Sequence, residues 1–180
     1  MPIVIAGGHG KIALVVDLER ASVDEVTEYV RGADAVVFAA GAGPGSGAAR
    51  KETVDRNAAI LLADAAQAAG VDRYLMISST GADPRATADD PVFQAYLRAK
   101  GAADEAVRAR TALTPTIVRP GLLTDDPGTG RVTIADSTIR GSIPREDVAA
   151  VLDQARTSGK TFEVISGEAP ITEAVAALVR

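Results

Sequence analysis

The strongest constraint on the fold is the alternation of short apolar segments with longer helical segments along most of the chain. Two of the apolar segments, AVVFAA at 35–40 and YLMIS at 74–78, are apolar on both faces. Strands of this kind are typical of a parallel sheet that is covered by helices on each side. We therefore expect an α/β fold with a doubly wound parallel sheet, in three layers of α/β/α.

The expected elements can be placed from local patterns. Strands are expected at residues 3–6, 14–17, 35–40, 73–78, 114–119, 132–135 and 161–166, and helices at 23–31, 51–69, 91–110, 144–157 and 171–179. Ser22 and Glu25 have the spacing of a capping box, and Asp90 stands as an N-cap before Pro91. No repeat or linker interrupts the 180 residues, so a single domain over residues 1–180 is expected.

Composition excludes several classes of protein. Hydrophobic residues make up 47% of the chain, and no apolar run approaches the roughly 18 residues that span a membrane. The absence of a secretion signal and of cysteine favours the cytoplasm, without disulfides or thiolate zinc sites. A net charge of −5 argues against nucleic acid as a partner.

The N-terminal segment PIVIAGGHGKIA predicts a buried strand that runs into a glycine loop. Gly7, Gly10 and Ala13 stand three apart, and glycines of this kind let the backbone approach a pyrophosphate closely. A simple tight turn is the alternative. His9 is the single histidine, and without partner ligands we expect it to contribute its backbone rather than to bind a metal.

The next expected strand follows too soon. Only seven residues separate Ala6 from Leu14, whereas parallel strands need a crossover of about a dozen residues or more. Three explanations stay open. The segment KIALVV begins a helix and DLER is a turn, or the two strands are not joined in the ordinary way, or a segment is absent from the chain.

Two further strand ends carry residues suited to a ligand site. Ligands bind beyond the carboxyl ends of parallel strands, where Ala39, Ala40 and Gly41 follow one buried strand. Ser78, Ser79 and Thr80 end another, and their hydroxyls either orient a substrate carbonyl or cap the strand.

Tyr96 and Lys100 are four residues apart on an expected helix and therefore share one face. A phenol with a pKa near 10 is a poor acid or base at neutral pH, and a nearby ammonium favours the phenolate and lowers that pKa. A surface tyrosine beside a surface lysine is the alternative, but the glycine loop and the strand-end hydroxyls favour a catalytic pair.

These segments together resemble a short, atypical member of the short-chain dehydrogenase/reductase superfamily, of the small NAD(P)H-binding type. The segments that carry the resemblance are GGHGKIA, VVDLERASVDEV, GADAVVFAAG, AAGVDRYLMISSTGA, YLRAKGAADEAV, TIVRPGLLTDDPGTGRV and IPREDVAAVL. Their order matches that of the family, and they cover nearly the whole chain.

The resemblance implies a Rossmann-like fold, a cofactor of NAD or NADP, and a set of site residues. The cofactor-binding residues it implies are Gly7, Gly8, His9, Gly10, Lys11, Ile12, Asp17, Leu18, Ala39, Ala40, Gly41, Ser78, Tyr96, Lys100, Pro120 and Gly121. The catalytic residues it implies are Ser79 or Thr80 for the substrate oxygen, Tyr96 for the proton and Lys100 beside it. No metal is expected.

The resemblance also explains the early second strand. VVDL corresponds to the third strand of the family, so the N-terminal βαβ unit is truncated. By the resemblance it lacks the first helix, the second strand and most of the link to the third strand, roughly 35 to 40 residues. Because that segment normally selects between NAD and NADP, the choice cannot be read. Its loss would expose apolar surface, and we expect impaired stability, a homodimer that covers this surface, or weak cofactor binding.

The function implied is an NAD(P)-dependent oxidoreductase. Relatives that act on nucleotide sugars carry a large additional domain, which 180 residues are too few to hold, so a small carbonyl, quinone or flavin-like substrate is expected. The alternative is a non-catalytic NAD(P)H-binding protein that senses redox state or regulates a partner.

Overall fold

The computed structural model describes residues 3–7, 16–137 and 140–178. By their contacts the described residues form two compact units. The first unit falls within residues 1–76 and 82–115, and the second unit within 77–81 and 116–180.

The sheet of the first unit is parallel. It contains β1 (Ile3–Ala6), β2 (Ala35–Phe38) and β3 (Tyr74–Ile77), of which the last residue belongs to the second unit. β2 pairs with both of the other strands, so Ile5, Val37 and Leu75 lie in register across the sheet. Among the described residues β1 pairs with β2 alone, which makes β1 an edge strand.

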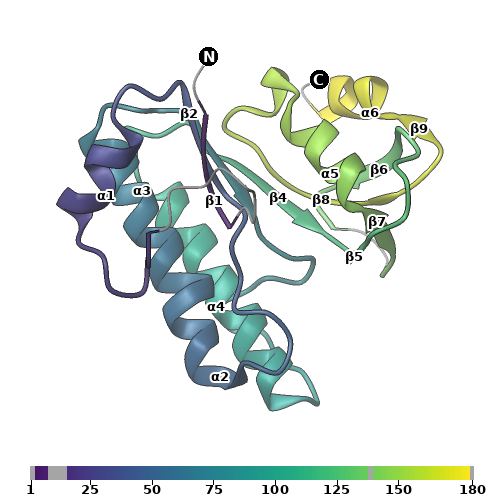
Figure 1. Cartoon of the computed structure of the whole chain (residues 1–180). Helices are drawn as coiled ribbons and strands as arrows, with labels where there is room; N and C mark the ends of the chain where they lie inside the picture. The colour runs from purple at the N-terminus through teal and green to yellow at the C-terminus, as the bar shows by residue number, and fades with distance from the viewer. Residues whose placement is uncertain (1–2, 8–15, 138–139, 179–180) are drawn as a thin grey trace. The chain divides into compact units, whose positions relative to one another are not determined.

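The helices of the first unit are α1 (Val23–Val30), α2 (Gly47–Arg50), η1 (Lys51–Asn57), α3 (Ala58–Ala68) and α4 (Pro91–Arg108). η1 is a π-helix that joins α2 to α3. α3 and α4 run side by side (Figure 1). Both predicted caps are confirmed: Ser22 Oγ accepts the Glu25 N–H, and Asp90 accepts from the first turn of α4.

The two faces of the parallel strands are covered to different degrees. On one face, Phe38 and Tyr74 are fully buried, and the Tyr74 hydroxyl donates to the Ala59 carbonyl of α3 at 2.9 Å. On the opposite face, Ile3 and Ile5 of β1 are 53% and 58% exposed. The expected exposure of apolar surface near the N-terminus is therefore confirmed at these two side chains.

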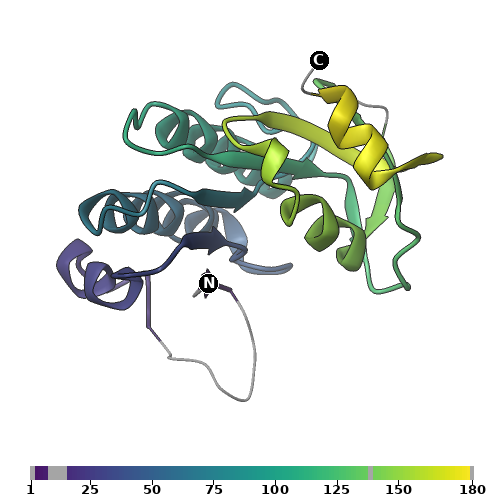
Figure 2. The ribbon, with the colours of Figure 1, turned by 90° about the horizontal axis from the view of Figure 1, so that it is seen from above.

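The second unit is a mixed sheet with two short helices. β4 (Thr116–Pro120) and β8 (Thr161–Ser166) are parallel, and β6 (Arg131–Ala135) is antiparallel to both β8 and β9 (Ala169–Pro170). β5 (Leu122–Thr124) pairs with β7 (Ser142–Pro144) in a separate parallel ladder. α5 (Arg145–Leu152) and α6 (Ile171–Leu178) lie next to each other (Figure 2), and η2 (Ala155–Thr157) follows α5.

Mostly parallel strands with flanking helices confirm the expected Rossmann-like α/β fold. The predicted strand at 14–17 is wrong for Val16 and Asp17, which lie in a loop, while its first two residues are outside the described residues. The short strands β5, β7 and β9 and the π-helix were not predicted, because segments of two to seven residues carry too little pattern. Within the described chain, no helix is both long and apolar enough to cross a membrane.

Candidate functional site

The first unit contains most of the described residues expected to bind the cofactor. Gly7 follows β1 with a φ of +103°, and a Cβ at this position would lie 2.5 Å from the backbone nitrogen of Ala40. Both facts require glycine, because no other residue adopts this φ without strain or leaves room for the neighbouring backbone. The other expected residues of the loop, Gly8, His9, Gly10, Lys11 and Ile12, lie outside the described residues.

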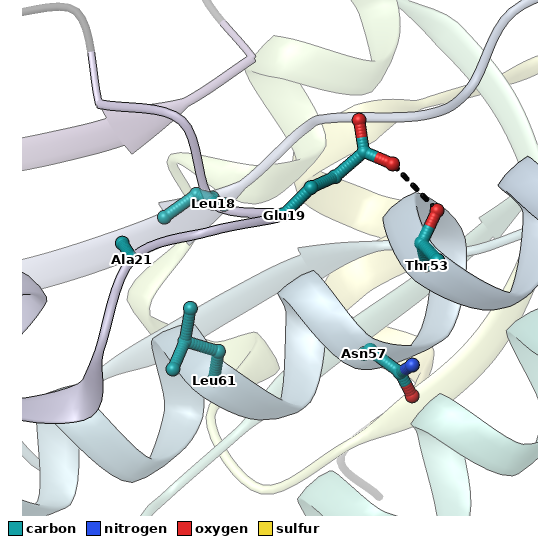
Figure 3. A pocket seen from close by; sticks show the side chains of 6 residues that line it. All are labelled: Leu18, Glu19, Ala21, Thr53, Asn57 and Leu61. Atoms are coloured by element: carbon teal, nitrogen blue, oxygen red, sulfur yellow. Dashed lines mark hydrogen bonds between the residues drawn. The ribbon is translucent and has the colours of Figure 1, made fainter.

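A cavity of about 220 Å³ lies beside the loop that precedes α1. Its lining residues come from that loop and from the helical segment that begins at η1 (Figure 3): Leu18, Glu19, Ala21, Thr53, Asn57 and Leu61. Leu18 thus lines a cavity, and its place beside an adenine stays a prediction. Asp17 does not line the cavity, and its carboxylate instead accepts the Glu19 N–H at 3.1 Å within the turn.

Glu19 ties this loop to the helical segment beside it. Its carboxylate accepts hydrogen bonds from the Thr53 hydroxyl at 2.6 Å and from the Arg50 guanidinium at 2.7 Å (Figure 3 shows the former). The hydrogen bond from Thr53 and then that from Arg50 lower the pKa of Glu19. The rim of the cavity is therefore held by polar contacts.

The end of β2 brings Ala39, Ala40 and Gly41 against two charged side chains. The Ala40 carbonyl accepts from Lys100 Nζ at 3.4 Å, and Asp55 Oδ2 accepts the Ala42 N–H at 3.2 Å. A Cβ on Gly41 would lie 3.1 Å from Asp55 Oδ1, so a larger residue would press on this carboxylate. The backbone beyond β2 is therefore positioned by side chains from η1 and α4.

Lys100 and Asp55 form a buried ion pair. The nitrogen of Lys100 lies 3.4 Å from Asp55 Oδ1, and the two side chains are 4% and 0% exposed. Burial is the largest influence on the Lys100 ammonium and lowers its pKa, while Asp55 and Asp104 act in the opposite direction. Lys100 also lies 5.5 Å from the ring centre of Phe38.

Tyr96, which is half-buried, lies between this ion pair and the start of η1. Its ring centre is 5.9 Å from Lys100 Nζ and 5.5 Å from Lys51 Nζ. Phe93 stacks on the same ring, with centres 6.0 Å apart and planes inclined by 25°. The expected Tyr96–Lys100 pair is thus brought together on α4, and Lys51 joins it from η1.

Sequence reasoning missed Lys51 and Asp55. Both lie on η1, within a stretch that the sequence shows only as the polar start of a helix. Both side chains are buried in the fold, at 7% and 0% exposed. The sequence does not indicate this burial, because charged residues near a helix start are mostly exposed. Short π-helical segments are often found at functional sites, and η1 is such a segment.

The remaining expected residues lie in the second unit and are described within it. The Ser78 N–H donates to the Val118 carbonyl at 2.7 Å, and the Thr80 N–H to the Pro120 carbonyl at 3.0 Å. Ser79 is half-buried, and its hydroxyl donates to the Thr80 carbonyl at 3.2 Å. A Cβ on Gly121 would lie 2.3 Å from the Gly141 carbonyl oxygen, so the chain also passes closely at Gly121. The carbonyl of Pro120 and the backbone of Gly121 therefore hold their strands.

Ser78 is the buried member of the three hydroxyl residues. It is 3% exposed, and its Oγ has no hydrogen-bond partner among the described residues. Glu163 of β8 is 6% exposed and accepts the Gly81 N–H through Oε1 at 3.0 Å. Ser78 and Glu163 are therefore a buried hydroxyl and a buried carboxylate within the second unit.

Comparisons with known proteins agree with this geometry. A protein of Bacillus subtilis named "Uncharacterized sugar epimerase YhfK" is 37% identical over 170 residues, which cover 92% of this chain and 78% of that protein. The solved structure of a "Putative NAD-dependent epimerase/dehydratase" from Bacillus halodurans is 39% identical, with a TM-score of 0.80 and coverage of 91% and 77%. The structure of the oxidoreductase ylbE from Lactococcus lactis, 24% identical, superposes with a TM-score of 0.86 over 99% of this chain and 97% of that chain, and shows the same fold.

The glycine at the end of β1, the close backbone at Ala40 and the cavity beside Leu18 all fit a dinucleotide. Residues 7–158 match the family described as NAD(P)H-binding. The chain therefore belongs to the NAD(P)H-binding family, and its cofactor is NAD or NADP.

Proposed function

We propose that this protein is an NAD(P)-dependent oxidoreductase that acts on a small carbonyl, quinone or flavin-like substrate. The observation that carries the proposal is the position of Tyr96, whose ring lies within 6 Å of the ammonium groups of both Lys51 and Lys100. A phenol in such a place is suited to give and take a proton near neutral pH.

The cofactor would be held mainly by backbone. Gly7 and the chain at Ala39–Gly41 would lie along the pyrophosphate, and the cavity beside Leu18 would take the adenine. When it is bound, the nicotinamide supplies or accepts a hydride. Asp17 accepts the Glu19 N–H within its own turn, and its contact with the adenosine half of the cofactor stays a prediction from the sequence.

Tyr96 would donate a proton to the substrate oxygen during reduction and take one during oxidation. Lys100 would hold the backbone at Ala40 in place beside Tyr96, because its nitrogen is already engaged with Asp55 and with the Ala40 carbonyl. Ser79 or Thr80 would orient the substrate oxygen. That role stays a prediction from the sequence, as does the single domain over residues 1–180.

The first turn of α4 supports an apolar, flat substrate. Val92 and Phe93 are 39% and 46% exposed, although both are large hydrophobic residues. Phe93 also stacks on Tyr96, so an aromatic surface is offered next to the group that would move the proton. A quinone or flavin ring would cover this surface, whereas a simple hydrated aldehyde would cover little of it.

The test begins with cofactor binding, measured as the shift in melting temperature with NADH and with NADPH. Turnover is then measured on a panel that contains a quinone, a flavin, an aldehyde and, because one relative is named a sugar epimerase, a sugar derivative. Tyr96→Phe is expected to lower the rate at least about a hundredfold while the cofactor-induced shift is kept. Phe93→Leu, which keeps an apolar side chain but removes the stacked ring, is expected to raise KM more than it lowers kcat.

Three results would contradict the proposal in different ways. Unchanged turnover in Tyr96→Phe would remove the role given to Tyr96. Cofactor binding without turnover on the whole panel would favour the alternative, a non-catalytic NAD(P)H-binding protein that senses redox state. No thermal shift with either cofactor would mean that this chain has lost the binding property of its family.

A further inference from the structure

Lys51 is the second of the two buried lysines near Tyr96. It is 7% exposed, and its ammonium donates to the Gly43 carbonyl at 2.7 Å. Among the described residues no carboxylate pairs with it, so its charge is not cancelled by an ion pair. A buried ammonium that is hydrogen-bonded to a neutral carbonyl keeps its net charge, and this charge acts on the neighbouring groups.

Lys100 differs from Lys51 in this respect. Its ammonium lies 3.4 Å from the Asp55 carboxylate. The negative charge of Asp55 therefore offsets the effect of the Lys100 charge on Tyr96. Lys51 is also slightly closer to the Tyr96 ring centre, at 5.5 Å against 5.9 Å for Lys100. The net positive charge at the ring therefore comes mainly from Lys51.

The other charged groups near Tyr96 do not alter this balance. On α4 itself, Asp104 is buried and adds to the negative charge on the Lys100 side. On η1, Glu52 and Arg56 form an ion pair with each other. On α2, Arg50 is paired with Glu19, and on α3, Asp64 is paired with Arg110. Lys51 is thus the one cation that these packed elements place at Tyr96 without a carboxylate partner in the described chain.

We propose that Lys51 is a second positioning residue for Tyr96, whose unpaired ammonium stabilises the phenolate form of that side chain. The arrangement divides two tasks between two lysines. Lys100 is fixed by Asp55 and shapes the backbone at Ala40, while Lys51 provides the net charge. This inference rests on the proposed function only for its purpose, since the charge arrangement exists without substrate or cofactor.

The titration of Tyr96 can be observed directly, in the full chain without cofactor. The chain has three tyrosines and no tryptophan, so the ultraviolet absorbance of tyrosinate can be followed during a pH titration. The difference between the titration curves of wild type and Tyr96→Phe gives the titration of Tyr96 alone. Tyr74 will not interfere, because burial raises its pKa far above the ordinary value near 10. Tyr29 is 42% exposed and is present equally in both proteins.

We expect Lys51→Gln to raise the titration midpoint of Tyr96 by about one pH unit or more, and Lys51→Arg to keep it near the wild-type value. Lys160→Gln, the same change at a lysine of the second unit, is the control for net charge and is expected to leave the midpoint unchanged. The double variant Asp55→Asn with Lys100→Met, which removes both members of the ion pair, is expected to move the midpoint less than Lys51→Gln does.

The proposal is overturned if Lys51→Gln leaves the midpoint within about 0.3 pH unit of wild type, or if the double variant moves it as far. If Lys51→Gln does not fold, as judged by its melting transition, Lys51→Met takes its place, because it keeps the length of the buried stem. A shifted midpoint with no turnover on any substrate would leave the charge arrangement standing and reject the oxidoreductase. Normal turnover in Tyr96→Phe would also leave the charge arrangement standing, and it would remove the proton-transfer role given to Tyr96.

Discussion

The ammonium of Lys100 lies 3.4 Å from the carboxylate of Asp55, and both side chains are almost completely buried. The two residues come from different helices and are 100 − 55 = 45 positions apart in the chain. The pair fixes α4 against η1, and it is stable only while both charges are present, because a single buried charge is costly.

Replacing one partner of this pair should therefore destabilise the protein strongly. Asp55→Asn keeps the shape of the side chain but leaves the Lys100 ammonium buried alone, and we expect a loss of about 3 to 5 kcal/mol in the free energy of unfolding. Urea unfolding followed by circular dichroism measures it. Asp64→Asn is the matched control: Asp64 pairs with Arg110 but is 41% exposed, so about 1 kcal/mol or less should be lost. Equal losses in the two variants would contradict the buried pair.

Stability should depend on pH in a way that Lys100 controls. Because burial lowers the pKa of Lys100 below 10.5, the folded protein releases this proton at a lower pH than the unfolded chain does. Between the two pKa values the unfolded chain binds more protons, so the contribution of Lys100 to stability rises with pH. We expect the free energy of unfolding of wild type to rise relative to that of Lys100→Met as the pH approaches 10.5.

The comparison with Lys100→Met is needed because Tyr74 acts in the opposite sense. Burial raises the pKa of Tyr74, so the unfolded chain loses this proton first and stability falls above pH 10 or so. Tyr74 is present in both proteins, and its effect cancels in the difference. A difference that stays constant or falls over this pH range would contradict the lowered pKa of Lys100.

The close approach at Gly7 should make this position intolerant of any side chain. Gly7→Ala meets both a φ of +103° and backbone atoms of Ala39 and Ala40 within 3 Å of the new Cβ. We expect a loss of more than about 2 kcal/mol in stability and a weaker thermal shift with NADH and NADPH. Gly70→Ala is the control, since its φ is +75° but nothing lies within 4 Å of its Cβ, so it should lose only about 1 to 2 kcal/mol and keep the cofactor shift.

The exposed face of β1 should tolerate a polar residue that its neighbour on β2 does not. Ile5 and Val37 lie opposite each other in the sheet, but Ile5 is 58% exposed and Val37 only 9%. Ile5→Thr should change the free energy of unfolding by less than about 1 kcal/mol, whereas Val37→Thr should cost about 1 to 3 kcal/mol for its buried hydroxyl. Thermal and urea unfolding of the two variants test this, and a larger loss for Ile5→Thr would show that the face of β1 is covered in solution.

Much of the fold could be predicted because its signals are local. The strands at 3–6 and 161–166 are those of the structure, and the helix that begins at Pro91 is capped by Asp90 as expected. Apolar strands, capping residues and the four-residue spacing of Tyr96 and Lys100 are all contained in short windows of sequence. The cofactor was predicted from the family resemblance, in which these segments follow one another in the same order.

The candidate site was predicted only in part. Tyr96 and Lys100 share a helix face, so their proximity follows from helical geometry alone. Lys51 and Asp55 reach the same place from η1, and their burial depends on how that segment packs against α4. No local pattern distinguishes these two residues from Glu52 and Arg56, which lie on the same segment and pair with each other.

The sequence by itself determined the α/β class, the main strands and helices, the glycine that ends β1 and the Tyr96–Lys100 pair, because each depends on neighbours a few residues away. Only the tertiary structure decided which charges meet. It paired Lys100 with Asp55 and left Lys51 beside Tyr96 with a carbonyl as its hydrogen-bond partner. The physical reason is that a buried charge is defined by what surrounds it, and those surroundings come from segments far apart in the chain.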